Sequence, residues 1–357
     1  NAEAYRAFVE MGAVWKEIGS AAKREDVTAH ASTLLHLAPL LYHDMHASLN
    51  RTVNVTADGD RCYPHRTEGN GPETIGQMSA LYRSMPEVFF SGTLTEQQMD
   101  DMYKSGLGLT SCENTGRWLC VGSPSAGTAP FTHVPFGFPH GLLQHDMVER
   151  FLLYFFTQSA HANTRGTWTT PESASIDRMH GAISYSAAGV NNVPLCIKWM
   201  HVFEEPETRT LWLAKATPRD WLVPGEAPLV IERATTRYGR LSFSLRVASA
   251  EDMASSGYSV HANVTLPAGF AAAGPAGGLV LRVRAPVAYA GKLSAVTVGG
   301  KAWAHFNASS ETISFTLAEL GTSSVSSGLS AIVASFGAAE ARKLGRAQVD
   351  LTRRVVQ

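Results

Sequence analysis

The sequence has few charged residues and almost no net charge. Asp, Glu, Lys and Arg make up 17% of its 357 residues, below the roughly 25% of an average soluble domain. Thirty basic residues against 31 acidic ones leave a formal net charge of −1, which argues against nucleic acid or an anionic membrane surface as a partner. No apolar run approaches the roughly 18 residues that span a bilayer. Apolar residues nevertheless make up 45%, so we expect a soluble, multidomain protein without a membrane span.

Several metal, nucleotide and nucleophile signatures are also missing. No Cys-x-x-Cys pair occurs, and His36, His43 and His46 share one helical face but span about three turns, too far apart for one metal ion. No Gly-x-Ser-x-Gly elbow is found. Gly106-Leu-Gly108 lacks the third glycine and the helix of a nucleotide fingerprint. The sequence therefore predicts no metal and no cofactor.

Cysteines and sequons indicate the compartment. Cys112 and Cys120 enclose a short loop around Gly116, a spacing that predicts a local disulfide and leaves Cys62–Cys196 as the remaining pair. Four reduced, buried thiols are the alternative. Four Asn-X-Ser/Thr sequons predict surface sites for N-linked glycans, at Asn50, Asn54, Asn263 and Asn307. Together these features predict a secreted or extracellular protein. Because the chain starts at Asn1 without a signal peptide, we expect a mature form or a piece of a longer chain.

Helical periodicity dominates the first part of the chain and stops at Phe203. Thr95 and Gln98 fit a capping box at the start of one of these helices. The expected helices are Ala4–Ala22, Thr28–Leu49, Pro72–Tyr82, Thr93–Ser105, Gly141–Ser159 and Asn192–Phe203. Residues 1–205 are therefore predicted to form an α-helical domain.

After Pro206 the apolar residues alternate with period two, which predicts short strands in an antiparallel β-sandwich over residues 206–357 with a C-terminal tail. Val298-Gly-Gly-Lys301 predicts a hairpin turn. Arg282 and Arg284 alternate along one strand and are expected on a solvated sheet face, and Gly321–Ser330 is expected as a loop. The expected strands are Leu211–Ala214, Leu229–Glu232, Leu241–Ala248, Ser259–Thr265, Leu279–Arg284, Ala295–Val298, Lys301–Phe306 and Thr312–Thr316.

The junction of the two parts resembles a known architecture. The segments that carry the resemblance are Gly166-Thr-Trp-Thr-Thr-Pro-Glu172, Val193–Met200, Leu211–Trp221, Thr236–Leu245, Arg284-Ala-Pro286, Val296-Thr-Val-Gly-Gly300 and Trp303. They are similar to the C-terminal part of the six-hairpin (α/α) toroid glycosidases and to the sandwich often appended to it. The resemblance covers residues 166–317 well and 1–165 loosely. It implies a multidomain α+β protein, a partial (α/α) toroid followed by a β-sandwich. A full toroid needs twelve helices, and residues 1–205 have room for about six or seven, so the rest would lie upstream or in another chain.

The resemblance implies glycoside hydrolysis, which needs two carboxyl groups on either side of the scissile bond. Glu172 is the first candidate, because Trp168 in the same long loop could stack on a sugar and raise the carboxyl pKa. Glu68 and Glu73 flank another glycine-rich loop and are candidates for the second carboxyl. The alternative for Glu172 is a structural carboxylate that holds the loop through backbone amides, and the alternative for the other two is a solvated loop acid.

Further candidates concern the binding of a carbohydrate. His145 and Asp146 are predicted to orient a substrate hydroxyl, with a buried structural histidine as the alternative. Trp118 and Tyr185 belong to a set of aromatic residues in the long loops, which could pack on sugar faces or simply cover the end of a helical array. We therefore expect a secreted carbohydrate-active protein resembling a glycoside hydrolase. The alternative is a non-catalytic structural glycoprotein, a subunit of a cell-surface or fibrous assembly, with other chains as partners.

Overall fold

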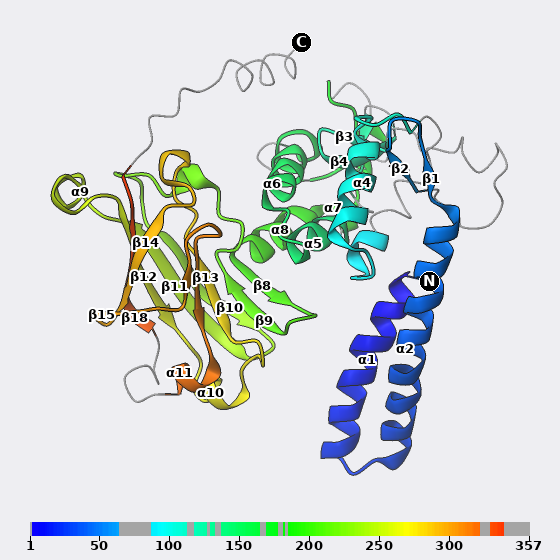
Figure 1. Ribbon diagram of the computed structural model, residues 1–357, viewed down its shortest axis with the longest axis horizontal. Coiled ribbons are helices and arrows are strands. Elements are labelled where there is room, and N and C mark those ends of the chain that lie inside the picture. The colour runs from blue at the N-terminus through cyan, green and yellow to red at the C-terminus, as the bar shows by residue number, and fades with distance from the viewer. Residues whose placement is uncertain are drawn as a thin grey trace. The chain divides into compact units, whose positions relative to one another are not determined.

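The computed structural model describes residues 2–63, 87–112, 118–126, 129–132, 137–164, 169–177, 181–182, 185–321 and 329–338. The chain is a mixed α+β protein that divides into two compact units, Asn1–Ile197 and Lys198–Gln357 (Figure 1). Helices dominate the first unit and β-strands the second. The change from helix to strand falls between His201 and Val202, slightly before the boundary expected at residues 205 and 206.

The first unit begins with a helical hairpin of α1 (Ala2–Ala21) and α2 (Glu25–Thr52), which lie side by side and antiparallel in Figure 1. Two glycines let the helices approach closely. A Cβ atom on Gly12 would meet the Leu35 side chain at 2.8 Å, and one on Gly19 would meet Thr28 Oγ1 at 2.5 Å. Both helices coincide with predicted ones, with ends that differ by a few residues.

The helix α4 (Glu96–Gly106) begins at its predicted N-cap. The Oγ1 atom of Thr95 accepts from the backbone N of Gln98 at 3.2 Å, and Gln98 Oε1 accepts from Thr95 N at 2.9 Å. The predicted capping box is confirmed. The helix expected over residues 72–82 lies outside the described residues.

The single helix predicted over residues 141–159 is wrong. The structure has α5 (Gly137–Gln144), α6 (Val148–Thr157) and a π-helical turn, η2 (Gln158–Ala162). The chain turns at Asp146, whose φ is +57°. Asp146 N donates to the carbonyl of Leu143 at 3.1 Å, and Met147 N donates to that of Leu142 at 2.8 Å. These two bonds make a Schellman motif, and aspartate is among the residues that tolerate its left-handed position. The hydrophobic periodicity of the sequence continues through this turn. Periodicity alone therefore could not reveal the break between α5 and α6.

Further helices and several short strands belong to the first unit. Residues 87–90 are helical, and α7 (Ala187–Val190) and α8 (Asn192–His201) follow later in the chain, with α8 continuing into the second unit. The strands pair antiparallel as β1–β2, β3–β4–β5 and β6–β7. Their bounds are β1 (Asn54–Val55), β2 (Arg61–Cys62), β3 (Leu119–Cys120), β4 (Ser123–Ala126), β5 (Ala129–Pro130), β6 (Ser173–Ala174) and β7 (Gly181–Ala182).

The disulfide of this unit joins Cys62 to Cys112, whose Cα atoms lie 5.5 Å apart. The predicted Cys112–Cys120 bond is therefore wrong, and so is the remaining pair Cys62–Cys196. Cys120 and Cys196 are free thiols. The sequence interpretation relied on the short spacing between two cysteines, whereas the bond closes a separation of 50 residues.

A polar contact shows how the two distant segments meet. The Oδ2 atom of Asp60, next to β2, accepts hydrogen bonds from the backbone N and the Oγ of Ser111, each at 2.8 Å. Thr56 Oγ1 adds a hydrogen bond to Ser111 Oγ at 2.8 Å. These contacts hold the β1–β2 hairpin against the residue that precedes Cys112, and so bring the two cysteines within bonding distance.

The second unit contains a six-stranded and a five-stranded sheet. The six-stranded sheet has the order β10-β11-β12-β18-β14-β15 and is antiparallel throughout, and the five-stranded sheet has the order β16-β17-β13-β9-β8 with one parallel pair, β13 with β9. The strands are β8 (Val202–Glu205), β9 (Thr210–Leu213), β10 (Leu229–Thr236), β11 (Gly239–Val247), β12 (Ser259–Thr265), β13 (Leu279–Arg282), β14 (Leu293–Val298), β15 (Lys301–Ala302), β16 (Phe306–Asn307), β17 (Thr312–Phe315) and β18 (Leu329–Phe336). The helices are η3 (Arg219–Trp221), α9 (Ala250–Ser256), α10 (Phe270–Ala273), η4 (Val287–Tyr289) and α11 (Leu317–Leu320).

Buried residues from both sheets form one hydrophobic cluster, which includes Leu213 and Leu281 from the five-stranded sheet and Phe243, Val260 and Ile332 from the six-stranded sheet. This cluster is the core of the second unit. Apolar residues from two sheets that exclude water from one another are the main source of its stability.

Strand predictions for this unit have mixed outcomes. The bounds of β12 are as predicted, and Val298 pairs with Lys301 across Gly299 and Gly300, which confirms the predicted hairpin turn. Both glycines have positive φ, as a two-residue hairpin of this type requires. The strands β8 and β18 were not predicted, and β18 begins inside the expected loop 321–330.

The expectation for Arg282 and Arg284 is wrong. Both are 4% exposed. Arg282 donates to the carbonyl of Lys215 at 3.2 Å, and Arg284 donates to that of Thr217 at 3.0 Å. Buried guanidinium groups must have hydrogen-bond acceptors, and the loop after β9 supplies backbone carbonyls as some of them.

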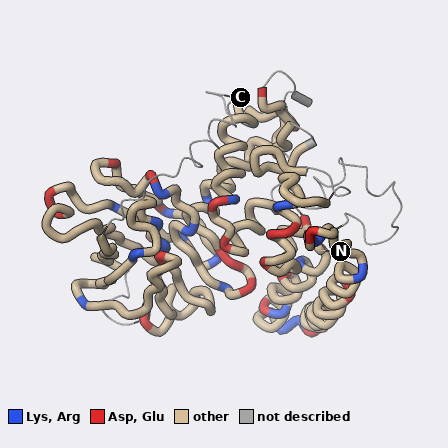
Figure 2. The backbone as a smooth tube through the Cα atoms, turned by 45° about the horizontal axis from the view of Figure 1, so that its top comes forward, with Lys and Arg blue, Asp and Glu red and all other residues tan. Residues whose placement is uncertain are grey.

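The asparagines of all four sequons, Asn50, Asn54, Asn263 and Asn307, are exposed, so these side chains are accessible. Asn263 and Asn307 accept hydrogen bonds through Oδ1, from Ala331 N at 3.0 Å and Ser310 N at 3.1 Å. A glycan would be attached at the amide nitrogen, so these contacts are compatible with it. Among the described helices, none combines the length and the apolar character that a membrane crossing requires. Charged residues are sparse along both units (Figure 2).

The disulfide gives a first prediction. Replacing Cys62 and Cys112 with serine should destabilise the first unit by about 2–4 kcal/mol, since the bond restricts a long loop in the unfolded chain. Hydrogen exchange of first-unit peptides during denaturant unfolding measures this. Cys120→Ser is the control and should change little. A non-reducing peptide map that links Cys112 to Cys120 would contradict the assignment.

Candidate functional site

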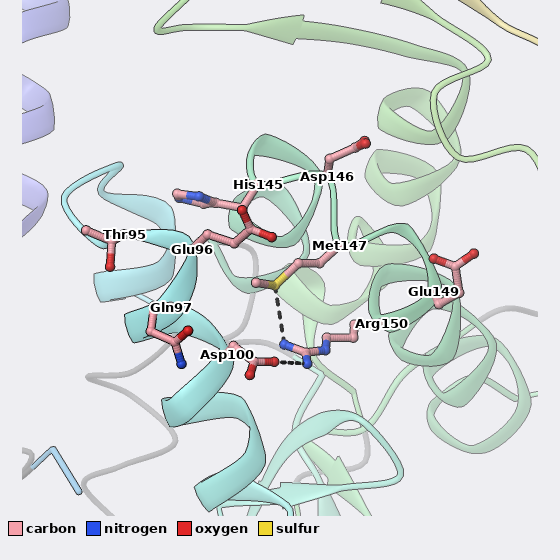
Figure 3. A pocket seen from close by; sticks show the side chains of 9 residues that line it. All are labelled: Thr95, Glu96, Gln97, Asp100, His145, Asp146, Met147, Glu149 and Arg150. Carbon is pink, nitrogen blue, oxygen red and sulfur yellow. Dashed lines mark hydrogen bonds and ion pairs between the residues drawn. The ribbon is translucent and has the colours of Figure 1, made fainter. Parts of the chain in front are cut away.

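A pocket of about 770 Å³ opens beside the N-terminus of α4 and the turn between α5 and α6. It is lined by Thr95, Glu96, Gln97, Asp100, His145, Asp146, Met147, Glu149 and Arg150 (Figure 3). Its volume is within the range of small-molecule sites. It contains two of the residues that the sequence singled out, His145 and Asp146.

Two local structures place these side chains. The capping box fixes the start of α4, so that Glu96 and Asp100, four residues apart, lie on one face of the helix. The left-handed turn at Asp146 ends α5 and starts α6 in a new direction. His145 and Arg150, which would otherwise lie on one continuous helix, thereby come to line a pocket together with α4.

An ion-pair network stabilises one wall of the pocket. Asp100 pairs with Arg150 from α6 (Figure 3). It also pairs with Lys104 from its own helix, at 2.6 Å. Arg150 also donates to the sulfur of Met147 at 3.5 Å, and its guanidinium lies 4.3 Å from the centre of the Tyr103 ring. The pair therefore ties α4 to α6 across the pocket.

The protonation of this wall follows from its contacts. Burial acts to raise the pKa of Asp100, but the hydrogen bonds from Lys104 and Arg150 outweigh it, and the pKa lies below its ordinary value of 3.8. Burial raises the pKa of Tyr103 to about 12. At neutral pH Asp100 is therefore ionised, so it can accept hydrogen bonds but cannot serve as a general acid.

The lining is polar and carries more acids than bases. The lining contains one guanidinium, that of Arg150, and one imidazole, that of His145. It contains four carboxylates, those of Glu96, Asp100, Asp146 and Glu149. In Figure 3 the carboxylates of Asp146 and Glu149 point away from the Asp100–Arg150 pair. Such a lining can accept several hydrogen bonds from a neutral ligand and repels anionic ones.

The segments that carry Glu172 and Tyr185 are hydrogen-bonded to one another in another part of the first unit. Glu172 is half-buried just before β6, and its carbonyl accepts from the backbone N of Thr132 at 3.0 Å. Ser186 N donates to the carbonyl of Thr170 at 2.7 Å, which places Tyr185 next to the segment that carries Glu172. Tyr185 is exposed. Glu172 is not among the residues that line the pocket.

Trp118 is in the core rather than at a surface. Only 1% of it is exposed, and its ring packs edge-on against Phe89 and Phe138, with centroids 5.9 and 5.7 Å away. Gly106 makes room for it, because a Cβ atom there would lie 2.6 Å from the indole. In this arrangement the ring cannot stack on a sugar. Three other predicted site residues, Glu68, Glu73 and Trp168, lie outside the described residues.

The free thiols and one buried histidine are poor candidates for catalysis. Burial raises the pKa of Cys120 and, more strongly, that of Cys196, so neither is a ready thiolate. Burial lowers the pKa of His201 to about 4, which keeps its ring neutral at physiological pH. In the part of the chain that the structure describes, no group of three or more His, Cys, Asp or Glu residues could hold a metal ion.

A scan of protein-family models finds no match to the chain, and no curated protein matches it. The site is therefore assigned from geometry alone. The sequence analysis named His145 and Asp146 as site candidates but not the other lining residues, since only the tertiary contact of α4 with α6 brings those together. The capping box at Thr95 did locate the start of α4, one wall of the pocket.

The Asp100 network gives a pH-dependent prediction. Because the folded-state pKa of Asp100 is lowered, its contribution to stability is present above its ordinary pKa and is lost as the pH falls through the folded value. Asp100→Asn should therefore cost about 1 kcal/mol at pH 7, and the difference from the wild type should shrink below about pH 4. Urea unfolding at several pH values measures it. Asp58→Asn, in an exposed turn, is the control. A cost that stays constant down to about pH 2 would contradict this account.

Burial of Trp118 gives another prediction. Trp118→Ala should destabilise the first unit by about 3–5 kcal/mol, since it leaves a large cavity. Trp221→Ala, at a tryptophan that is 40% exposed, should cost clearly less. Thermal unfolding of both variants makes the comparison. Wild-type stability of Trp118→Ala, combined with loss of sugar binding, would instead restore the carbohydrate role.

Proposed function

We propose that the protein is an extracellular carbohydrate-active protein resembling the glycoside hydrolases, and that the pocket at the α4, α5 and α6 corner binds a saccharide. The observation that carries the proposal is the convergence of His145 and Asp146 with Gln97 and Glu96 in one polar pocket. Amide, imidazole and carboxylate groups supply the donors and acceptors that sugar hydroxyls need. The excess of carboxylates favours neutral or amino sugars over uronic or sulfated ones.

Other observations support the finer parts of this proposal. The hydrophobic cluster shared by the two sheets of the second unit is what a β-sandwich would have. The Cys62–Cys112 bond and the four exposed sequon asparagines support an extracellular location. The helical hairpin and the further helices of the first unit are compatible with part of an (α/α) toroid.

In this proposal Glu172 remains the candidate catalytic acid, with Glu68 or Glu73 as the second carboxyl. Thr132 fixes the backbone of Glu172 through a hydrogen bond from its amide, and it also donates from Oγ1 to the Glu172 carbonyl at 3.2 Å. A backbone held in this way fixes the position from which the Glu172 side chain extends, as a positioned catalytic group needs. The exposed ring of Tyr185 nearby could supply a stacking surface.

The alternative proposal is a non-catalytic structural glycoprotein of a cell-surface or fibrous assembly. Two observations favour it. Trp118, one of the aromatic residues expected to hold sugar, is buried, and Glu172 does not line the pocket. In that case glycans and neighbouring chains would be the relevant partners.

Calorimetric titration with neutral oligosaccharides and with their uronic acid counterparts tests the pocket. His145→Ala and Asp146→Asn should each weaken binding of a neutral oligosaccharide about tenfold, the loss expected for one or two hydrogen bonds. Asparagine suits the left-handed backbone at position 146, so the second variant removes charge and keeps the turn. Asp58→Asn is the control. Equal binding by all variants, or stronger binding of the uronic acids, would contradict the pocket assignment.

Hydrolysis is tested separately, with aryl glycosides and polysaccharides, on the wild type and Glu172→Gln. Loss of turnover with unchanged binding would support Glu172 as the acid. Turnover that survives the substitution would refute that role. Binding without any hydrolysis by the wild type would favour the structural glycoprotein.

A further inference from the structure

One face of the α1–α2 hairpin is apolar and exposed. On α1, Met11, Val14 and Ile18 follow at helical spacing and are 42%, 44% and 54% exposed. On α2, Leu37 and Leu40 are 40% and 52% exposed. We call Met11, Ile18 and Leu37, with the half-buried Trp15 and Leu34, the apolar hairpin face. Single exposed apolar residues are common on proteins, but a contiguous set of them marks an interaction site.

Helical geometry places Met11, Ile18 and Leu37 on the same side of the hairpin, whereas Val14 and Leu40 lie on the outer flanks of the two helices, about 160–180° from the line of contact. Met11 and Ile18 each precede a buried glycine of α1, and Leu37 precedes a buried alanine of α2. A residue that precedes a buried one therefore points about 100° away from the line where α1 and α2 touch. Because the two helices run in opposite directions, one step back along each helix turns both side chains toward the same side of the hairpin. The half-buried Trp15 and Leu34 fall between these residues of the two helices by the same reasoning.

Acidic residues border this face. Along α1 they recur every seven residues, just beyond Val14 on the side away from α2, and on α2 they fall near the two ends of the Leu37 row. They are Glu3, Glu10, Glu17, Asp26 and Asp44. Arg51, in the last turn of α2, is a basic residue on the same side. The border is therefore acidic, in a protein whose overall charge is nearly zero.

Contacts within the hairpin compensate the charge of two of these five acids. Arg6 pairs with Glu10 at 2.8 Å, and Arg24 donates to both carboxylate oxygens of Asp26, at 2.8 and 2.7 Å. The ring of His43 is 3.6 Å from Asp44. Such pairs at a surface contribute little and leave carboxylate oxygens open to a second donor.

We propose that the apolar hairpin face docks an amphipathic helix of a partner protein, whose apolar stripe is flanked by Lys or Arg. A helix laid against two antiparallel helices buries its stripe between them, as in other helix-recognition modes. Basic flanking residues would then meet the acidic border. A second copy of this chain fits less well, because it would bring two acidic borders together.

The probe is a synthetic helical peptide of about three heptads, with Leu at positions a and d and Lys at e and g. The matched peptide carries Glu in place of Lys. Binding to the full chain is followed by fluorescence anisotropy at low and high salt. The lysine peptide should bind more tightly than the glutamate peptide, and its affinity should fall as salt screens the acidic border.

Two matched variants test where the peptide binds. Ile18 lies on the apolar hairpin face, whereas Val9, 38% exposed, lies on the opposite flank of the same helix. Ile18→Asp should weaken binding about tenfold or more, and Val9→Asp less than about twofold. Leu37→Asp repeats the test on α2. Circular dichroism checks that α1 stays folded.

Several results would overturn the proposal. One is equal affinity for the two peptides, and another is equal affinity of the Val9 and Ile18 variants for the lysine peptide. Failure of the lysine peptide to bind the wild type would do so as well. A self-association of the wild type that Ile18→Asp abolishes would assign the face to a second copy instead.

Discussion

The left-handed turn at Asp146 is the constraint on which the candidate site depends. Without it, α5 and α6 would continue as one helix, and the side chains from His145 to Arg150 would spread around its surface. With it, the chain changes direction within two residues, and the turn and the first residues of α6 line a pocket with the start of α4. The Asp100–Arg150 pair then holds α4 and α6 together at this corner. A single backbone conformation thus converts a run of helical residues into a concave, polar surface.

The near-zero net charge conceals a local pattern. Acidic residues gather at the pocket and along the border of the apolar hairpin face, whereas buried arginines such as Arg282 and Arg284 lie inside the second unit. Arg282 and Arg284 donate hydrogen bonds to backbone carbonyls. Because they are buried, they affect the surface potential less than exposed arginines do. Surface recognition by this protein therefore depends on where charges lie rather than on their sum.

The sequence allowed prediction of features that local chemistry determines. The capping box at Thr95, the bounds of β12 and the Gly299-Gly300 turn all follow from residues close in the chain. Strand β18 could not be read in this way. Its buried residues Leu329 and Ile332 are separated by an irregular step at Ala331, whose φ is +52°, so simple alternation fails there. Asn263 of β12 compensates by accepting from Ala331 N.

Features that depend on contacts between distant segments were beyond such reasoning. The spacing of Cys112 and Cys120 favoured a local bond, while the bond to Cys62 requires that Asp60 meet Ser111. The pocket also depends on contacts between distant segments. Its walls come from parts of the chain some fifty residues apart, as the pair of Asp100 with Arg150 shows. Trp118 was placed in a loop by composition, yet the glycine at the end of α4 gives it space in the core. In each case the sequence names the participants but not their partners.

The position of the disulfide also affects what proteolysis would do to this protein. Cys62 and Cys112 enclose a stretch of chain between them as a covalent ring. A protease that cuts once inside the ring opens it without separating the two ends, since the sulfur bridge still joins them. The nicked molecule therefore keeps the mass of the chain plus one water, and it releases two fragments only after reduction. Cleavage outside the ring divides the chain at once.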